Sequence, residues 1–129
     1  MTDTQTRALV LFAHGARDPL WAQPLEHLRL ALARIAPQMA VRVAFLEMQE
    51  PGLVPTLAEL AAQGRRHIDV APIFWSKGGH IADDLPPRLA AFARSHPGVA
   101  VRVLPVLSDL PGMHEFIART LLQLADAPQ

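Results

Sequence analysis

The sequence has no cysteine in its 129 residues. This absence excludes disulfide bonds, thiolate zinc sites, cysteine nucleophiles and iron–sulfur clusters held by cysteine. Any metal must therefore be bound by nitrogen and oxygen ligands. An excess of charge of one sign is also lacking, because 12 Lys and Arg residues balance 12 Asp and Glu residues. A chain without net charge has no long-range field to attract nucleic acid or an anionic membrane surface.

Long apolar runs are missing as well. No segment approaches the roughly 20 apolar residues that cross a membrane, and residues 1–7 lack the apolar core of a signal peptide. We therefore expect a cytoplasmic protein. The length suits a single domain over residues 1–129, with frayed ends at residues 1–7 and 126–129.

The apolar residues that are present alternate between strand and helix patterns. Four short apolar runs predict strands, at residues 8–13, 41–46, 67–75 and 99–107. Apolar residues at helical spacing predict helices that carry Trp21 to Ile35, Leu53 to Leu60, Leu85 to Phe92 and Met113 to Leu124. This alternation predicts an α/β three-layer sandwich of the flavodoxin-like kind, with a four-stranded parallel sheet in the order 2-1-3-4.

Prolines occur within the expected third strand and near the start of the expected third helix. Pro72 falls inside the expected strand, although proline removes a donor from the hydrogen-bond ladder. For the helix that follows, Asp83 or Asp84 is expected to be the N-cap. Pro86 and Pro87 would then occupy the first turn, where the missing amide hydrogens do no harm.

Two histidines follow two different predicted strands. In the order 2-1-3-4, the carboxyl ends of strands one and three meet at the switch point of the sheet, where ligands of such sheets bind. His14 and His80 follow these ends, and Glu47 follows the second strand. Two imidazoles and a carboxylate suit cobalt, nickel, iron or zinc, and ligand type does not choose among them. Glu50 replaces Glu47 if the strand register differs.

Structural interpretations of these residues stay open. A histidine after a strand is often a loop or capping residue, Arg17 and Asp18 can be a helix cap with a solvated neighbour, and Lys77 can be an exposed loop residue. The glycines beside the histidines would allow a large planar ligand close to the backbone; they are Gly15, Gly78 and Gly79. The remaining histidines are expected to face solvent; they are His27, His67, His96 and His114.

The segments around these residues resemble the signature blocks of a known family, the short sirohydrochlorin chelatases of the CbiX type. These belong to the class II, ATP-independent tetrapyrrole chelatases, and the resemblance covers nearly the whole chain. It implies a chelatase-like half-domain that tolerates Pro72. The blocks are Phe12-Ala13-His14-Gly15-Ala16-Arg17-Asp18-Pro19, Val43-Ala44-Phe45-Leu46-Glu47 with Glu50-Pro51, Pro72-Ile73-Phe74, and Gly78-Gly79-His80-Ile81-Ala82-Asp83-Asp84-Leu85-Pro86.

The resemblance implies a lyase that inserts a divalent metal into sirohydrochlorin in cobalamin or siroheme biosynthesis. Cobalt is the expected metal, with nickel and iron as alternatives, and the metal is a substrate, so no permanently bound cofactor is expected. His14 and His80 would bind the incoming metal, with Glu47 as their acidic partner. Larger members fuse two such halves, so a homodimer is expected. Ser76-Lys77 departs from the apolar or small pair that is common in the family.

The expected chemistry divides the work between the two histidines. One holds the metal while the other, neutral near pH 7, accepts a ring proton, and Glu47 completes the metal shell or orients a histidine. Arg17, Lys77 and Arg88 are candidates to hold the substrate carboxylates. Two alternatives remain, a metal or tetrapyrrole carrier and a phosphoryl-transfer enzyme with His14 as nucleophile. No Gly-x-x-x-x-Gly-Lys-Ser/Thr run for ATP is present.

Overall fold

A computed structural model describes residues 4–76 and 78–128, without the side chains of residues 79–82. It contains a four-stranded, fully parallel sheet in the order β2-β1-β3-β4, which confirms the predicted topology. The central strands β1 and β3 are neighbours, so the switch point of the sheet lies between their carboxyl ends. The strands are β1 (Arg7–Ala13), β2 (Ala40–Phe45), β3 (His67–Pro72) and β4 (Ala100–Val103).

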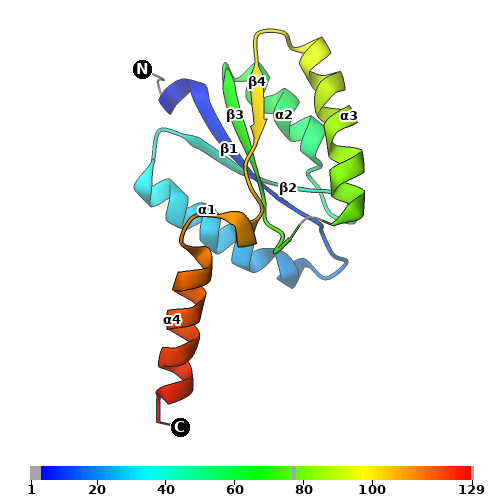
Figure 1. The fold of residues 1–129 in the computed structure, drawn as a ribbon. Helices are drawn as coiled ribbons and strands as arrows, with labels where there is room; N and C mark the ends of the chain where they lie inside the picture. The colour runs from blue at the N-terminus through cyan, green and yellow to red at the C-terminus, as the bar shows by residue number, and fades with distance from the viewer. Residues whose placement is uncertain (1–3, 77, 129) are drawn as a thin grey trace.

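Helices cover the sheet on two sides (Figure 1). Helix α1 (Gln23–Ile35) packs against β2, while α2 (Leu53–Ala62) and α3 (Gly79–Ser95) pack together on the other face. Helix α4 (Met113–Asp126) instead extends away from the sheet and carries the C-terminus. Short 3-10 turns complete the chain: η1 (Thr4–Thr6), η2 (Pro19–Ala22) and η3 (Leu107–Asp109).

The main core lies between the sheet and the α2–α3 layer. Successive side chains of a strand point to opposite faces, so alternate residues of β1 and β3 enter this core. Its largest fully buried side chains lie on β1, α2 and β3; they are Val10, Phe12, Leu57, Leu60, Ile68 and Val70. A smaller apolar layer lies under α1, where Leu11, Leu25 and Val41 are buried. The helices thus hold the carboxyl ends of β1 and β3 in place.

The third and fourth strands are shorter than predicted. Strand β3 ends at Pro72 and β4 at Val103, so the residues beyond them form loops. Pro72 is tolerated because it faces β4: Val70, two residues earlier, accepts a hydrogen bond from the Leu104 amide at 2.8 Å, and β4 has ended there. The amide hydrogen that proline lacks therefore has no strand to bond.

Helix α3 begins five or six residues earlier than predicted. Its N-cap is Gly78 and its first residue is Gly79, so the expected cap at Asp83 or Asp84 is wrong, and Pro86 and Pro87 lie inside the helix. Both prolines are exposed, so water can reach this part of the helix surface. His80 therefore belongs to the first turn of α3 instead of the loop before it.

The first helix also begins differently. Asp18 is an N-cap, in agreement with its interpretation as a helix cap, and Pro19 follows it; the Asp18 carboxylate accepts a hydrogen bond from Leu20 N at 3.0 Å. It caps η2, however, and α1 begins only at Gln23. Trp21, expected on the buried stripe of this helix, is 73% exposed. Of the histidines expected to face solvent, His96 is partly buried, because its ring stacks on Phe92 with centroids 4.2 Å apart.

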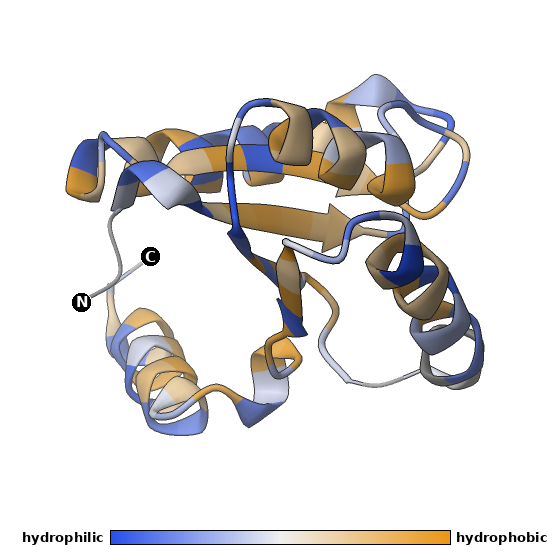
Figure 2. Ribbon diagram, turned by 90° about the horizontal axis from the view of Figure 1, so that it is seen from above, coloured by the Kyte–Doolittle hydropathy of each residue, from blue (hydrophilic) through white to orange (hydrophobic). Residues whose placement is uncertain are grey.

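Helix α4 is amphipathic, as predicted, but contributes no buried residue to the domain. Figure 2 shows it apart from the other helices, with hydrophobic residues along its length. Its principal contacts are with η3. In the part of the chain that the structure describes, no helix is long and apolar enough to pass through a bilayer.

Candidate functional site

His14 lies directly beyond the carboxyl end of β1, where its side chain is exposed. Its ring packs edge-on against Phe74, with centroids 4.6 Å apart, and Phe74 packs in the same manner on buried Phe12 at 5.8 Å. These edge-on aromatic contacts hold one side of the imidazole ring against the domain. Neither ring nitrogen of His14 has a hydrogen-bond partner among the described residues, so both are available to a ligand.

Glu47 is held beside His14 through the backbone. The Glu47 amide donates to the His14 carbonyl at 3.0 Å, one step beyond the Leu46–Ala13 bond that continues the β1–β2 ladder. Gly15 makes this approach possible: its φ is +88°, and a Cβ at this position would lie 1.9 Å from the Glu47 carbonyl oxygen. The Glu47 side chain is exposed, so it can turn towards a bound ion.

His80 lies in the first turn of α3, which follows β3 after a short loop. Its side chain lies outside the described part of the structure, as do all atoms of Lys77 and the environment of Gly79. The convergence of the His14 and His80 rings therefore stays a prediction. Gly78 is exposed, and no heavy atom lies within 4 Å of where its Cβ would be, so a ligand can approach its backbone.

A cavity of about 170 Å³ opens beside His14. It is smaller than the roughly 300–1,000 Å³ typical of pockets for small molecules. One copy of the chain thus offers an open-sided recess at the carboxyl ends of β1 and β2, not an enclosed pocket. The recess is lined by Ala13, His14, Gly15, Ala16, Trp21, Leu25, Phe45, Gln49, Ile73 and Phe74.

Sequence reasoning missed three residues of this recess. Trp21 stands at its rim, Phe74 supports His14, and the Gln49 side chain accepts a hydrogen bond from Ala16 N at 2.9 Å. The aromatic content near the strand ends was a usable signal for Trp21 and Phe74. No sequence pattern identified Gln49, because its role depends on how the loop after β2 folds towards Gly15.

The candidate cations lie in different surroundings. Arg17 is exposed in the loop after His14 and has no partner among the described residues. Arg88 lies on α3 and lines a shallow depression with Leu46, the residue before Glu47. Glu50 is exposed in the same loop as Glu47. Among the side chains that the structure describes, which exclude His80, no three His, Asp or Glu residues form a group that could hold a metal.

Comparisons with known proteins identify the family of the chain. The CbiX family model matches residues 8–124. A sirohydrochlorin cobaltochelatase of Methanococcoides burtonii is 26% identical over 121 residues, which cover 91% of this chain and 92% of that protein. A sirohydrochlorin cobaltochelatase of Methanothermobacter thermautotrophicus is 33% identical over 81 residues, which cover 60% of this chain and 54% of that protein.

Solved structures share the fold. A CbiX protein of Marinobacter aquaeolei VT8 superposes with a TM-score of 0.79 at 23% identity, over 93% of this chain and 98% of that one. SirB from Bacillus subtilis with Fe3+ gives a TM-score of 0.77 at 20% identity, over 95% of this chain but 48% of SirB. The sirohydrochlorin chelatase SirB from Bacillus subtilis subspecies spizizenii, in complex with cobalt, gives 0.62 at 27% identity, over 78% of this chain and 43% of that one. With its topology, its signature segments and a family match over almost its entire length, the chain belongs to the CbiX family.

Proposed function

We propose that this protein inserts a divalent metal ion, with cobalt as the first candidate, into sirohydrochlorin. The observation that carries the proposal is the position of His14. His14 is exposed beside the switch point of the sheet, and neither of its ring nitrogens is hydrogen-bonded to a described residue. The chain itself belongs to the CbiX family. Relatives named sirohydrochlorin cobaltochelatase and a cobalt complex of SirB support this substrate pair.

In the proposed reaction, the metal leaves water and protein ligands for four ring nitrogens as the macrocycle loses two protons. His14 and His80 share this work: a neutral imidazole can either donate a lone pair to the metal or accept a proton from a pyrrole nitrogen. The edge-on contact with Phe74 limits rotation of the His14 ring. Exposed Glu47 would complete the metal shell or balance its charge.

Substrate binding would use the open rim. Sirohydrochlorin carries several carboxylates, and Arg17, which has no partner among the described residues, is free to pair with one. Arg88 and Lys77 are further candidates. The 73% exposed Trp21 offers an aromatic face at the edge of the recess for the flat ring.

We further propose that the active form is a homodimer. The chain aligns with 48% of a SirB chain, so two copies match the length of one such protein. The recess beside His14 is open and small, about 170 Å³, and a second copy facing it would enclose a larger space.

The test is an insertion assay that follows the absorbance of sirohydrochlorin with cobalt, nickel or iron(II) and catalytic amounts of protein. His14→Ala and His80→Ala should each lower the rate by about 10²–10⁴-fold, because each removes a proton acceptor or metal ligand. His27→Ala is the matched control, since His27 is exposed on α1 away from the recess. Unchanged insertion by either site variant would refute the role of that histidine.

The same assay separates an enzyme from a carrier. A carrier would bind metal or tetrapyrrole in a fixed ratio and form no metallated product beyond one equivalent per chain. Turnover beyond that equivalent supports the proposed function, and its absence with all three metals contradicts it. Competition among the metals then ranks cobalt against nickel and iron.

A further inference from the structure

The recess beside His14 is too small for a whole tetrapyrrole. Its volume of about 170 Å³ corresponds to about five or six waters at roughly 30 Å³ each, whereas pockets that enclose small molecules usually span about 300–1,000 Å³. A short arm that ends in a carboxylate, such as the acetate and propionate side chains of sirohydrochlorin, fits into this space. The flat ring itself would stay outside, next to exposed His14.

The lining of the recess suits an arm that is apolar along its stem and charged at its end. Most of the wall is apolar, with Leu25 and Phe45 buried and Ile73 half-buried. Such side chains can contact the methylene groups of the arm, as they contact the stems of long polar residues. Among the described residues that line the recess, none is acidic, and the polar side chains are those of His14 and Gln49. A carboxylate here meets no like charge in the wall.

The Gln49 side chain is held by its amide oxygen, which leaves its NH2 group free. Gln49 Oε1 accepts a hydrogen bond from Ala16 N at 2.9 Å. Because a backbone N–H can only donate, the atom that faces it must be the oxygen, so the NH2 group is turned away from Ala16. This group has no partner among the described residues, and it is not buried, since every buried side-chain nitrogen or oxygen among them has a partner. Two N–H donors are therefore open to a ligand.

The loop after β2 fixes Gln49 in this position through an uncommon backbone conformation. Met48, the residue before Gln49, has a φ of +66°, in the left-handed region that favours glycine. It lies in a tight turn in which Gln49 N donates to the Glu47 carbonyl at 2.8 Å, and Glu47 N is bonded to the His14 carbonyl. Residues held in such conformations occur preferentially at binding sites, where the surrounding bonds maintain them. These bonds present the Gln49 amide to the recess before any ligand arrives, which favours binding.

We propose that the recess is a subsite for one carboxylate arm of the tetrapyrrole, and that a carboxylate oxygen of this arm accepts a hydrogen bond from the Gln49 NH2 group. The proposal rests on the proposed function, because it assigns a further residue to the same substrate. The stem of the arm lies against the apolar wall, and exposed Arg17, one residue after Ala16, can pair with the carboxylate from the rim. An arm bound beside His14 fixes where the ring meets the histidine proposed to bind the metal.

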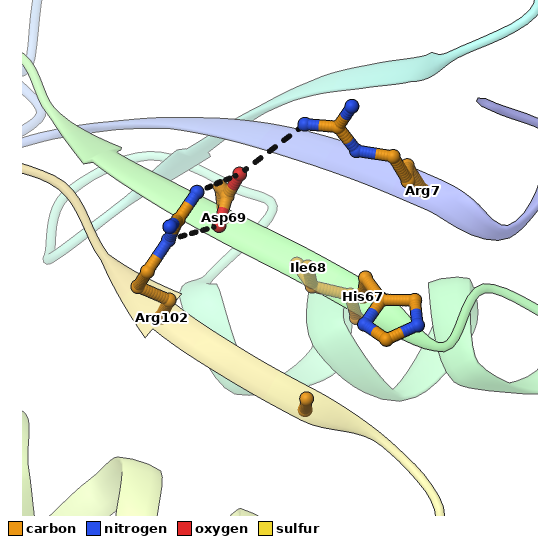
Figure 3. A pocket seen from close by; sticks show the side chains of 6 residues that line it. Arg7, His67, Ile68, Asp69 and Arg102 are labelled. Atoms are coloured by element: carbon orange, nitrogen blue, oxygen red, sulfur yellow. Dashed lines mark hydrogen bonds and ion pairs between the residues drawn. The ribbon is translucent and has the colours of Figure 1, made fainter. Parts of the chain in front are cut away.

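A larger cavity elsewhere on the sheet is less suited to such an arm. It measures about 380 Å³ and lies at the amino ends of β1 and β3, where Figure 3 shows Arg7 and Arg102 on either side of Asp69. Arg102 makes two hydrogen bonds to the Asp69 carboxylate, at 2.9 and 3.1 Å, and the Arg7 guanidinium lies 3.9 Å from it. A carboxylate that enters this cavity would therefore be repelled by Asp69.

Gln49→Glu separates a binding role from a structural role. Glutamate has nearly the same shape and keeps an oxygen for Ala16 N, but it replaces the two donors by a negative charge at neutral pH. We expect the KM for sirohydrochlorin and the dissociation constant of metal-free sirohydrochlorin to rise by about 10- to 100-fold, because a hydrogen bond to a charged group is lost. The value of kcat should stay within about threefold, since the arm is bound equally in the ground and transition states.

Gln38→Glu is the matched control. Gln38 is exposed, its Oε1 accepts a hydrogen bond from Thr4 Oγ1 at 3.3 Å, and it precedes β2, at the end of the strand opposite to the recess. The same change of charge at this position should leave KM and the dissociation constant within about twofold.

Hydrogen exchange of the Ala16 amide, measured by NMR, reports the structural bond separately. The exchange rate should stay within about threefold of the wild-type rate in Gln49→Glu, which keeps an acceptor. It should rise by at least about tenfold in Gln49→Leu, which has none.

Ala16→Leu tests the space instead of the donor. Ala16 lines the recess, is half-buried, and would keep its N–H for Gln49. The larger side chain fills the volume that the arm needs, so KM and the dissociation constant should again rise by about tenfold or more. Circular dichroism and urea unfolding establish that the variant is folded. If Gln49→Glu releases the Ala16 amide, Ala16→Leu alone decides.

Equilibrium dialysis of metal-free sirohydrochlorin measures binding apart from insertion, so the subsite and the proposed function can fail separately. A wild-type chain that inserts metal, with affinities unchanged in Gln49→Glu and Ala16→Leu, overturns the subsite and leaves the function intact. A response in only one of two variants that both keep the Ala16 bond also overturns the subsite, as does a loss of kcat without a loss of affinity. Binding that depends on both residues, without turnover, supports the subsite and contradicts the function. A wild-type chain that does not bind sirohydrochlorin overturns both.

Discussion

At the scale of single residues, the candidate site depends on the close approach of two loops at Gly15. A Cβ at Gly15 would lie 1.9 Å from the Glu47 carbonyl, whereas Gly64 has the same φ of +88° with no heavy atom within 4 Å of such a Cβ. A comparison of the two glycines therefore separates the effect of a left-handed backbone conformation from the effect of a close steric contact, which usually occur together. Gly64 is required by backbone conformation alone, and Gly15 also by contact.

Gly15→Ala should destabilise the protein more than Gly64→Ala. At Gly64 we expect a loss of about 1–2 kcal/mol, the cost of a left-handed conformation for an L-residue. At Gly15 the clash with the Glu47 carbonyl adds a further loss of roughly 1–3 kcal/mol and displaces His14 from Glu47. Urea unfolding measures both changes, and the insertion assay should detect a loss of activity only at Gly15. Equal destabilisation of the two variants would contradict this account of Gly15.

The residues of the site could be predicted in part. The sequence placed His14 and Glu47 at the strand ends, and the structure brings their backbones together through a 3.0 Å hydrogen bond. The sequence also suggested that Gly15 leaves room for a ligand. The structure gives another reason for a glycine here, the close approach of the Glu47 carbonyl. The spacing of Trp21 predicts a place on the buried stripe of a helix, yet the 3-10 turn η2 places it in solvent. Spacing alone does not separate a 3-10 turn from the first turn of an α-helix.

At the scale of elements, the order of strands followed from the alternation of patterns, while the ends of elements did not. The apolar run after Pro72 continues through Phe74, so periodicity extended β3 too far, and the hydrogen bonds to β4 end it earlier. Pro86 and Pro87 predicted a first turn because proline is costly inside a helix, about 3 kcal/mol. The helix nevertheless begins at Gly79, which places His80 in its first turn.

Helix α2 packs against the sheet whose strand ends carry the candidate site. Leu57 is fully buried between α2 and the sheet, while Val54 on the same helix is 38% exposed. We expect Leu57→Ala to lower the free energy of unfolding by about 2–5 kcal/mol, because it leaves a cavity in the main core. Val54→Ala, the matched control, should cost below about 1 kcal/mol. Thermal or urea unfolding tests both, and a small effect at Leu57 would mean that the core is packed differently.

At the scale of the whole molecule, the apolar side of α4 stays exposed among the described residues. The pattern from Met113 to Leu124 predicts an amphipathic helix, and the structure confirms the helix. The same pattern would result whether the helix covers its own sheet or that of another copy. The direction in which α4 leaves the domain is set by Gly112 and by the hydrogen bonds of the Leu107 and Ser108 amides to the loop after β3. The periodicity of the sequence indicates neither of them.

The proposed homodimer should have a stability that depends on protein concentration. Folding and association are then coupled, so each tenfold increase in concentration should stabilise the dimer by about 1.4 kcal/mol and raise the melting temperature. Calorimetry over a hundredfold concentration range measures this dependence. A wild-type melting temperature that stays constant over this range would indicate a stable monomer.

The two tryptophans of the chain both lie beyond the carboxyl ends of the strands, and both are more than half exposed. Trp21 borders the recess, and Trp75 contacts the start of α4. The tryptophan fluorescence of this protein therefore originates at one edge, where substrate and partner would meet, and not in its interior. This intrinsic fluorescence should respond to binding at that edge without an attached dye.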